Sequence, residues 1–178
     1  MSSLLTTLII GVSLSMDAFS LALVYGTTEI DRKNKVLLAI IVGLFHFFMP
    51  LIGLYFGSLI TRYLIINVGV LVAIIFGVIG GEMIVSGVKG REEKLLVSLV
   101  GFLLFGFSVS IDSLTTGIGL NVINSNYLQV ATIFALVSGW FTYFGLHLGN
   151  KLSLKFGNYA TIIGGIILII LGIYYVFR

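Results

Sequence analysis

Two copies of one short pattern hold the residues best suited to chemistry in this chain. Ser13-Leu-Ser-Met-Asp17 recurs as Ser108-Val-Ser-Ile-Asp112, and each copy lies in a long apolar stretch with no other formal charge. A carboxylate held in hydrocarbon is costly unless it is paired, protonated or hydrated, so an acid inside a membrane is a candidate functional group. The two acids therefore predict a path for an ion through a membrane.

Hydroxyl groups flank each acid at helical spacing. Each copy has one hydroxyl a turn before the acid and another a turn after it, on one face of a helix. The members are Ser13, Asp17 and Ser20 in the first copy, and Ser108, Asp112 and Thr115 in the second. Two carboxylates neutralise a divalent cation and hydroxyls add neutral oxygen ligands, which suits a hard cation. In the alternative interpretation each Asp only ties neighbouring helices together.

His46 is a third candidate ligand. It precedes the only proline, Pro50, by one turn, and this proline cannot donate a hydrogen bond to the carbonyl of His46. Ten residues from a helix edge near Val36 place His46 about 15 Å deep, close to the bilayer centre. The alternative is a satisfied core histidine. Glu82 and His147 lie nearer the helix ends, where we expect them to face the membrane surface.

The composition is that of an integral membrane protein. Of the 178 residues, 58% are hydrophobic and 10% charged, and the mean hydropathy is +1.17. A net charge of +3, spread over scattered basic residues, excludes nucleic acid as the expected partner. Without cysteine the chain forms no disulfide and no thiolate metal site. We expect the lipid bilayer as its surroundings and no permanently bound cofactor.

Six apolar segments reach the length of about 20 residues that a spanning helix needs. They lie near residues 4–25, 36–59, 64–87, 95–120, 127–150 and 158–177, with a tight turn at Arg62, a charged linker at Lys89 to Lys94 and a polar turn at Asn121 to Asn126. The fold class is therefore an all-α integral membrane protein with six transmembrane helices. We read the first segment as a retained helix, because no basic residue precedes it.

Basic residues predict the orientation. Eight of the ten lie in the first, third and fifth linkers, which the positive-inside rule assigns to the cytoplasm. Both termini then face outward.

Three helices per half predict a 3+3 inverted-topology repeat within one transmembrane domain, 1–178. Repeat one covers about 1–88 and repeat two about 95–178. Gly53 and Gly145, and likewise Gly80 and Gly172, are 92 residues apart, whereas the two acids are 95 apart. At the offset of 92 the counterpart of His46 is Ser138. Glycine pairs such as Gly77/Gly81 and Gly145/Gly149 predict close helix packing.

The motifs resemble one family along nearly the whole chain. Four short motifs resemble those of the MntP family of bacterial manganese efflux pumps. They are Met16-Asp-Ala-Phe19, Pro50-Leu-Ile-Gly53, Gly80-Gly-x-Met-Ile84 and Ser110-Ile-Asp-Ser-Leu-x-x-Gly-x-Gly119. The resemblance implies export of Mn(II), as transported substrate, across the bacterial inner (plasma) membrane. It places Asp17 and Asp112 at the family's aspartate positions. The family often has glutamate where this chain has His46, and segments such as Tyr25-Gly26 also look similar to YtaF-type sporulation proteins.

We expect proton-coupled alternating access, in which Asp17 and Asp112 bind the metal with His46 and the hydroxyls, and protonation from outside releases it. Alternatives are export of another divalent metal and a non-transporting membrane scaffold. An enzyme is not expected, because the chain has no HExxH pair, GxSxG turn, GxGD motif or cysteine nucleophile. The sequence leaves a homo-oligomer open.

Overall fold

In the computed structural model, every regular element of the described residues is an α-helix. The structure describes residues 3–28, 30–63, 68–89, 97–118, 126–156 and 158–177. The helices are α1 (Ser3–Tyr25), α2 (Arg32–Tyr63), α3 (Val68–Lys89), α4 (Leu99–Val109), α5 (Ile111–Ile118), α7 (Tyr127–Phe156) and α8 (Asn158–Phe177).

Three of these helices contain segments long and apolar enough to cross a membrane, within the part of the chain described. They are Leu4–Tyr25, Arg32–Tyr55 and Tyr127–Leu154. The pair α4 and α5, bent by 41° at a short break, would make a fourth span. The apolar segment Asn158–Tyr174 in α8 is shorter. The chain is thus a multi-pass helical protein.

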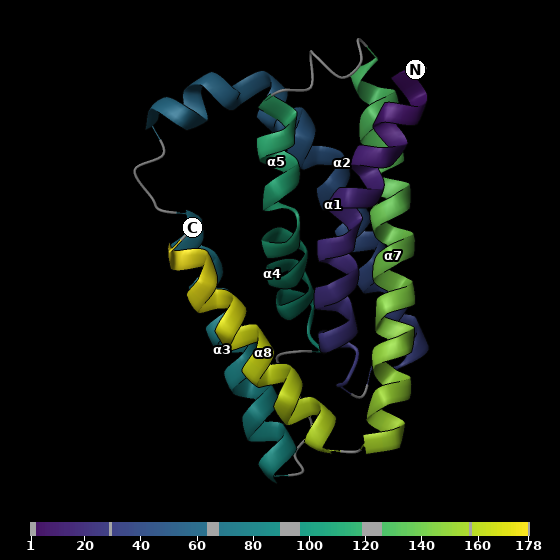
Figure 1. The fold of residues 1–178 in the computed structure, drawn as a ribbon, viewed down its shortest axis with the longest axis vertical. Coiled ribbons are helices and arrows are strands. Elements are labelled where there is room, and N and C mark those ends of the chain that lie inside the picture. The colour runs from purple at the N-terminus through teal and green to yellow at the C-terminus, as the bar shows by residue number, and fades with distance from the viewer. Residues whose placement is uncertain are drawn as a thin grey trace.

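The helices form one bundle with a side pair (Figure 1). α1 packs along α7, α7 packs against α2, and α2 packs against α4 and α5. α3 and α8 pack mainly on each other and reach the rest through smaller contacts with α1, α4 and α7. In Figure 1 successive helices alternate in direction, with α4 and α5 running the same way, so that α1 is parallel to α7 and α2 to α4–α5.

Glycines set the closest approaches between α3 and α8. A Cβ added at Gly80 would lie 2.5 Å from the carbonyl oxygen of Gly165, and one at Gly172 would lie 3.2 Å from that of Ala73. Gly80 and Gly172 are 92 residues apart, as are Ala73 and Gly165. The contact of Gly80 with Gly165 and the contact of Gly172 with Ala73 therefore involve the same two repeat positions, with the two halves of the chain exchanged.

The other two interfaces correspond in the same way. A Cβ at Gly145 in α7 would lie 2.6 Å from the Phe19 carbonyl oxygen in α1, and one at Gly53 in α2 would collide with the Leu114 carbonyl oxygen in α5. Gly53 and Gly145 are 92 residues apart, and Phe19 and Leu114 are 95 apart. The α1–α7 contact and the α2–α5 contact thus use equivalent positions of the two halves.

Several predicted boundaries need correction. α2 continues through Arg62, where a turn was expected, because this end of the helix is long and uninterrupted by proline or glycine after Gly57. α7 extends to Phe156, so Lys151 lies in its final turns rather than in a linker. The predicted bounds of the last helix, 158–177, are confirmed. The predicted turns at 90–94 and 121–125 lie outside the described residues.

The glycine pairs also differ from one another. Gly145 and Gly149 pack against α1 as predicted, since added Cβ atoms would meet backbone atoms there. At Gly77 and Gly81 an added Cβ would meet no described atom within 4 Å. The predicted packing role is therefore wrong for this second pair within the described part of the chain.

Candidate metal pathway

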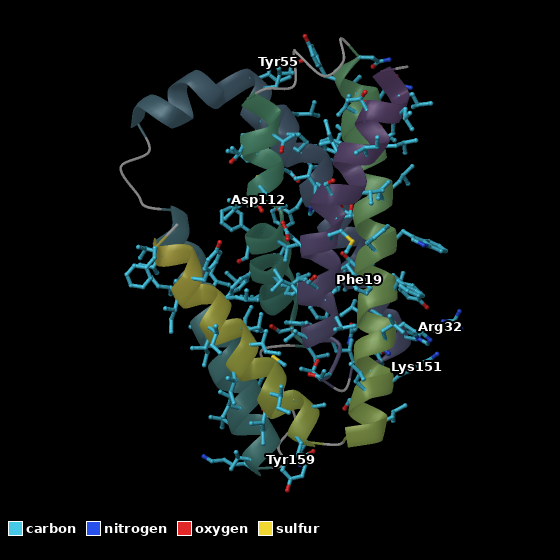
Figure 2. All side chains as sticks on the ribbon, in the orientation of Figure 1. Phe19, Arg32, Tyr55, Asp112, Lys151 and Tyr159 are labelled. Carbon is cyan, nitrogen blue, oxygen red and sulfur yellow. The ribbon has the colours of Figure 1, made fainter. Side chains whose placement is uncertain are left out.

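The chain breaks its fourth apolar segment at Ser110, immediately before Asp112. The Ser110 hydroxyl donates to the carbonyl of Gly106 at 2.7 Å, and its backbone N–H donates to that of Phe107 at 3.2 Å. Asp112 lies in the first turn of α5, on the far side of a 41° bend from α4 (Figure 2).

This bend corrects the expected face of the second motif. Ser108 belongs to α4, whereas Asp112 and Thr115 belong to α5, so the three do not share one continuous helix. Ser108 is buried and donates to the Leu104 carbonyl at 2.8 Å, and Thr115 is exposed. Asp112 is half-buried.

The first motif keeps its predicted face, on an unbroken helix. Ser13, Asp17 and Ser20 are all exposed on α1. The two serines donate to carbonyls of their own helix, Ser13 to Ile9 at 2.9 Å and Ser20 to Met16 at 2.8 Å. Their oxygen lone pairs still face outward, where they can accept a hydrogen bond or bind a cation. Asp17 is therefore not covered by the protein, in contrast to the buried carboxylate that the sequence suggested.

His46 is the most enclosed of the predicted ligands. Its side chain is 1% exposed, and Nδ1 lies 3.0 Å from the carbonyl oxygen of Val42, one turn earlier. Because a carbonyl only accepts hydrogen bonds, Nδ1 carries the hydrogen and Nε2 of the neutral ring keeps its lone pair. The helix that carries His46, α2, packs on α5, which carries Asp112.

The structure thus packs the helix of Asp112 against the helix of His46 but does not gather all predicted ligands. Among the described residues, no group of three or more His, Asp or Glu side chains lies close enough to hold one metal ion. Asp17 lies on the exposed face of α1, and that helix packs chiefly on α7. Glu82 is half-buried on α3, and His147 is exposed on α7.

Several fully buried hydroxyls were not predicted to belong to the site. Ser15 in α1 and Ser138 in α7 are fully buried, with their Oγ atoms 3.0 Å apart. Ser113 and Thr142 are also fully buried, and their hydroxyls have no hydrogen-bond partner in the described part of the chain. The signal was present in the motif, because the middle serine of each pentad is the one that faces the neighbouring helix.

Comparison with known proteins shows the family of this chain. A family model described as "Putative manganese efflux pump" matches residues 29–176. The chain belongs to the MntP family. Relatives with the name "Putative manganese efflux pump MntP" include one from Bacillus pumilus (strain SAFR-032). It is 35% identical over 96% of this chain and 93% of its own length. Another, from Methanocorpusculum labreanum, is 39% identical over 96% of this chain and 94% of its own length. No solved structure gives a significant match.

Membership of the MntP family makes a transporter the relevant class of protein. Its described function is the efflux of manganese, which requires a polar route across the bilayer. In this chain the described residues with that chemistry include the acids and hydroxyls of α1 and α5, the hydroxyls of α7 and the imidazole of His46 in α2.

Proposed function

We propose that this protein exports Mn(II) from the cytoplasm across the bacterial inner (plasma) membrane. The observation that carries the proposal is the packing of α5, which carries Asp112, against α2, which carries the buried His46, in a chain of the MntP family. A carboxylate and an imidazole are ligands that Mn(II) accepts, and inside a membrane they are costly to keep without a function.

The proposal includes six transmembrane helices arranged as a 3+3 inverted repeat. The paired glycine contacts support it: Gly80 and Gly172 meet equivalent carbonyls in the α3–α8 interface, and Gly53 and Gly145 do so on α5 and α1. Alternating helix directions support it too (Figure 1). In this arrangement α4 and α5 are the two parts of one broken span. Broken helices next to the ion site are common in secondary transporters with inverted repeats.

The cytoplasmic side is the end that carries the starts of α2 and α8. Figure 2 shows Arg32 and Lys151 toward the end where Tyr159 lies, and Tyr55 at the other end. Short cytoplasmic loops are rich in lysine and arginine, and aromatic side chains favour both interfaces. Both chain termini then face outward.

Transport proceeds by alternating access. Asp17 and Asp112 bind the cation, His46 adds a nitrogen, and the hydroxyls of Ser13, Ser20, Ser108 and Thr115 add oxygen ligands. Rocking of one repeat against the other brings the exposed α1 face toward α5, so that Asp17 joins Asp112 and His46. Protonation of the carboxylates from outside then competes with the metal, because protons and cations share the same oxygen atoms.

Transport into sealed vesicles tests this proposal. The purified protein, reconstituted in liposomes with a pH-sensitive dye inside, is expected to accumulate Mn(II) and release protons when Mn(II) is added outside. The Asp112→Asn variant at equal incorporation is the matched control. Equal Mn(II) uptake by the two proteins would contradict the site, and no uptake by either would favour the membrane scaffold.

A further inference from the structure

The helix pair α4–α5 runs along α2 between two glycine contacts. A Cβ at Gly106 would lie 2.8 Å from the Phe45 ring, and a Cβ at Gly117 would collide with the carbonyl oxygen of Pro50. On α2, His46 follows Phe45 directly and precedes Pro50 by one turn. The imidazole therefore lies within the stretch of α2 that these two contacts delimit.

Two serines occupy the matching stretch on the other side of the interface. Ser110 and Ser113 lie between Gly106 and Gly117, at spacings of four, three and four residues. Gly117 contacts α2, and Ser113 lies one turn before it on the unbroken α5, so Ser113 is on the side facing α2. Both serine side chains are 0% exposed. The stretch of α2 that contains His46 thus packs against a stretch of α4 and α5 with two hydroxyls that have no access to solvent.

Ser110 and His46 donate their side-chain hydrogens to backbone carbonyls of their own helices. The single hydroxyl hydrogen of Ser110 goes to the carbonyl of Gly106, and the Nδ1 hydrogen of His46 goes to that of Val42. This leaves the Ser110 oxygen and the His46 Nε2 atom as acceptors. Ser113 Oγ is buried with no hydrogen-bond partner among the described residues.

An excess of buried acceptors beside a carboxylate favours a cation. Buried polar atoms are nearly always paired, so the Ser113 hydroxyl, which has no partner among the described residues, needs a ligand that offers positive charge or hydrogens. A water molecule would offer hydrogens but would leave the nearby charge of Asp112 uncompensated. A divalent cation would satisfy both the lone pairs and the charge.

We propose that His46 Nε2, Ser113 Oγ and the Asp112 carboxylate form a nitrogen-containing site between α2 and α5 that selects the transported metal and admits Co(II), Fe(II) and Zn(II) as well as Mn(II). The proposal rests on the export function above. Ser110 lies behind the site with its hydrogen fixed, and Val42 fixes the ring tautomer. Imidazole raises affinity along the series from Mn(II) to Co(II), so this site is less restricted to manganese than one made only of oxygen.

Cobalt is the direct probe, because its visible absorption and magnetic resonance report nitrogen ligands. The full chain in lipid nanodiscs is titrated with Co(II), and bound Mn(II) is examined by pulsed electron paramagnetic resonance for coupling to imidazole nitrogen. We expect nitrogen coupling in the wild type and in His147→Gln, which changes the only other histidine. His46→Gln loses the coupling and weakens Co(II) binding at least about tenfold. Ser113→Ala keeps the nitrogen coupling but weakens metal binding. Ser86→Ala, at a buried serine of α3, changes neither the coupling nor the affinity.

Three results would overturn this inference: nitrogen coupling that persists in His46→Gln, metal bound in the wild type without nitrogen coupling, or Ser113→Ala binding as tightly as Ser86→Ala. Each leaves the export proposal standing if the wild type still transports Mn(II) in vesicles. A wild type that neither binds nor transports metal would contradict both proposals. In a further test, His46→Glu is expected to lower the ratio of Co(II) to Mn(II) affinity, and an unchanged ratio would contradict the inference.

Discussion

The hydroxyl oxygens of Ser15 and Ser138 lie 3.0 Å apart in a fully buried contact that ties α1 to α7. Ser15 already donates its hydrogen to the Gly11 carbonyl at 2.6 Å, so Ser138 is the donor in this pair. At the repeat offsets these two serines correspond to Ser110 and His46. At the repeat positions of this hydroxyl pair, the chain thus also has the Ser110 hydroxyl and the His46 imidazole.

Loss of the hydrogen bond between Ser15 and Ser138 should lower the free energy of unfolding modestly. Ser138→Ala removes the donor and is expected to cost about 0.5–1.5 kcal/mol of unfolding free energy, as for other hydrogen bonds between membrane helices. Thr132→Val is the matched control, because the Thr132 hydroxyl is exposed and bonds only to its own helix. Denaturant unfolding in mixed micelles measures the difference. Equal stability of the two variants would show that the serine pair contributes nothing.

Close backbone contact between α1 and α7 predicts intolerance at Gly145. A Cβ there would lie 2.6 Å from the Phe19 carbonyl oxygen, so Gly145→Ala should separate the helices and cost about 1–3 kcal/mol. Gly81→Ala changes a glycine whose Cβ would meet no described atom within 4 Å. The ratio of folded to aggregated protein after heating in detergent compares the two. A greater loss for Gly81→Ala would contradict this packing.

A side-chain hydrogen bond ties the turn after α1 to α8. The Thr161 hydroxyl donates to the Thr27 carbonyl at 3.0 Å, and both residues are buried. Thr161→Val keeps the side-chain shape and removes the donor. Amide hydrogen exchange in residues 26–28 should then become about tenfold faster, equivalent to roughly 1.4 kcal/mol, with no change in the middle of α7. Unchanged exchange in this turn would show that packing alone holds it.

A chain without cysteine allows a direct test of topology. Lys151→Cys near the end of α7 should react with a membrane-impermeant maleimide only after the cells are opened, because we place this end in the cytoplasm. Gln129→Cys, exposed in the first turn of the same helix, should react in intact cells. The reverse pattern would invert the orientation and the direction of transport derived from it.

The sequence predicted helix type and several boundaries well because apolar length is a local property. The bounds of α8 and the end of α1 at Tyr25 were found from composition alone. The break at Ser110 was not, because Ser15 occupies the same place in the first pentad and bonds back to Gly11 within an unbroken helix. Identical local patterns therefore gave different backbones, and the difference arises from the neighbouring helices.

The candidate site was predicted in part for a similar reason. Each pentad has hydroxyls on two faces of its helix, and spacing alone favoured the face that carries the aspartate. The structure buries the other face, with Ser15 and Ser110 against neighbouring helices, and leaves Asp17 exposed. Which face meets a neighbour depends on tertiary packing, which periodicity in an almost uniformly apolar helix does not reveal.

The central claim is that this chain lowers cellular manganese through its two aspartates. Intracellular metal content should be measured in manganese-stressed bacteria that lack their own exporter and express the wild type, Asp17→Asn or Asp112→Asn at matched membrane levels. We expect manganese to fall several-fold with the wild type only, because each variant removes a charge needed to bind the cation. An equal fall with either variant, or no change in any divalent metal with the wild type, would contradict the claim.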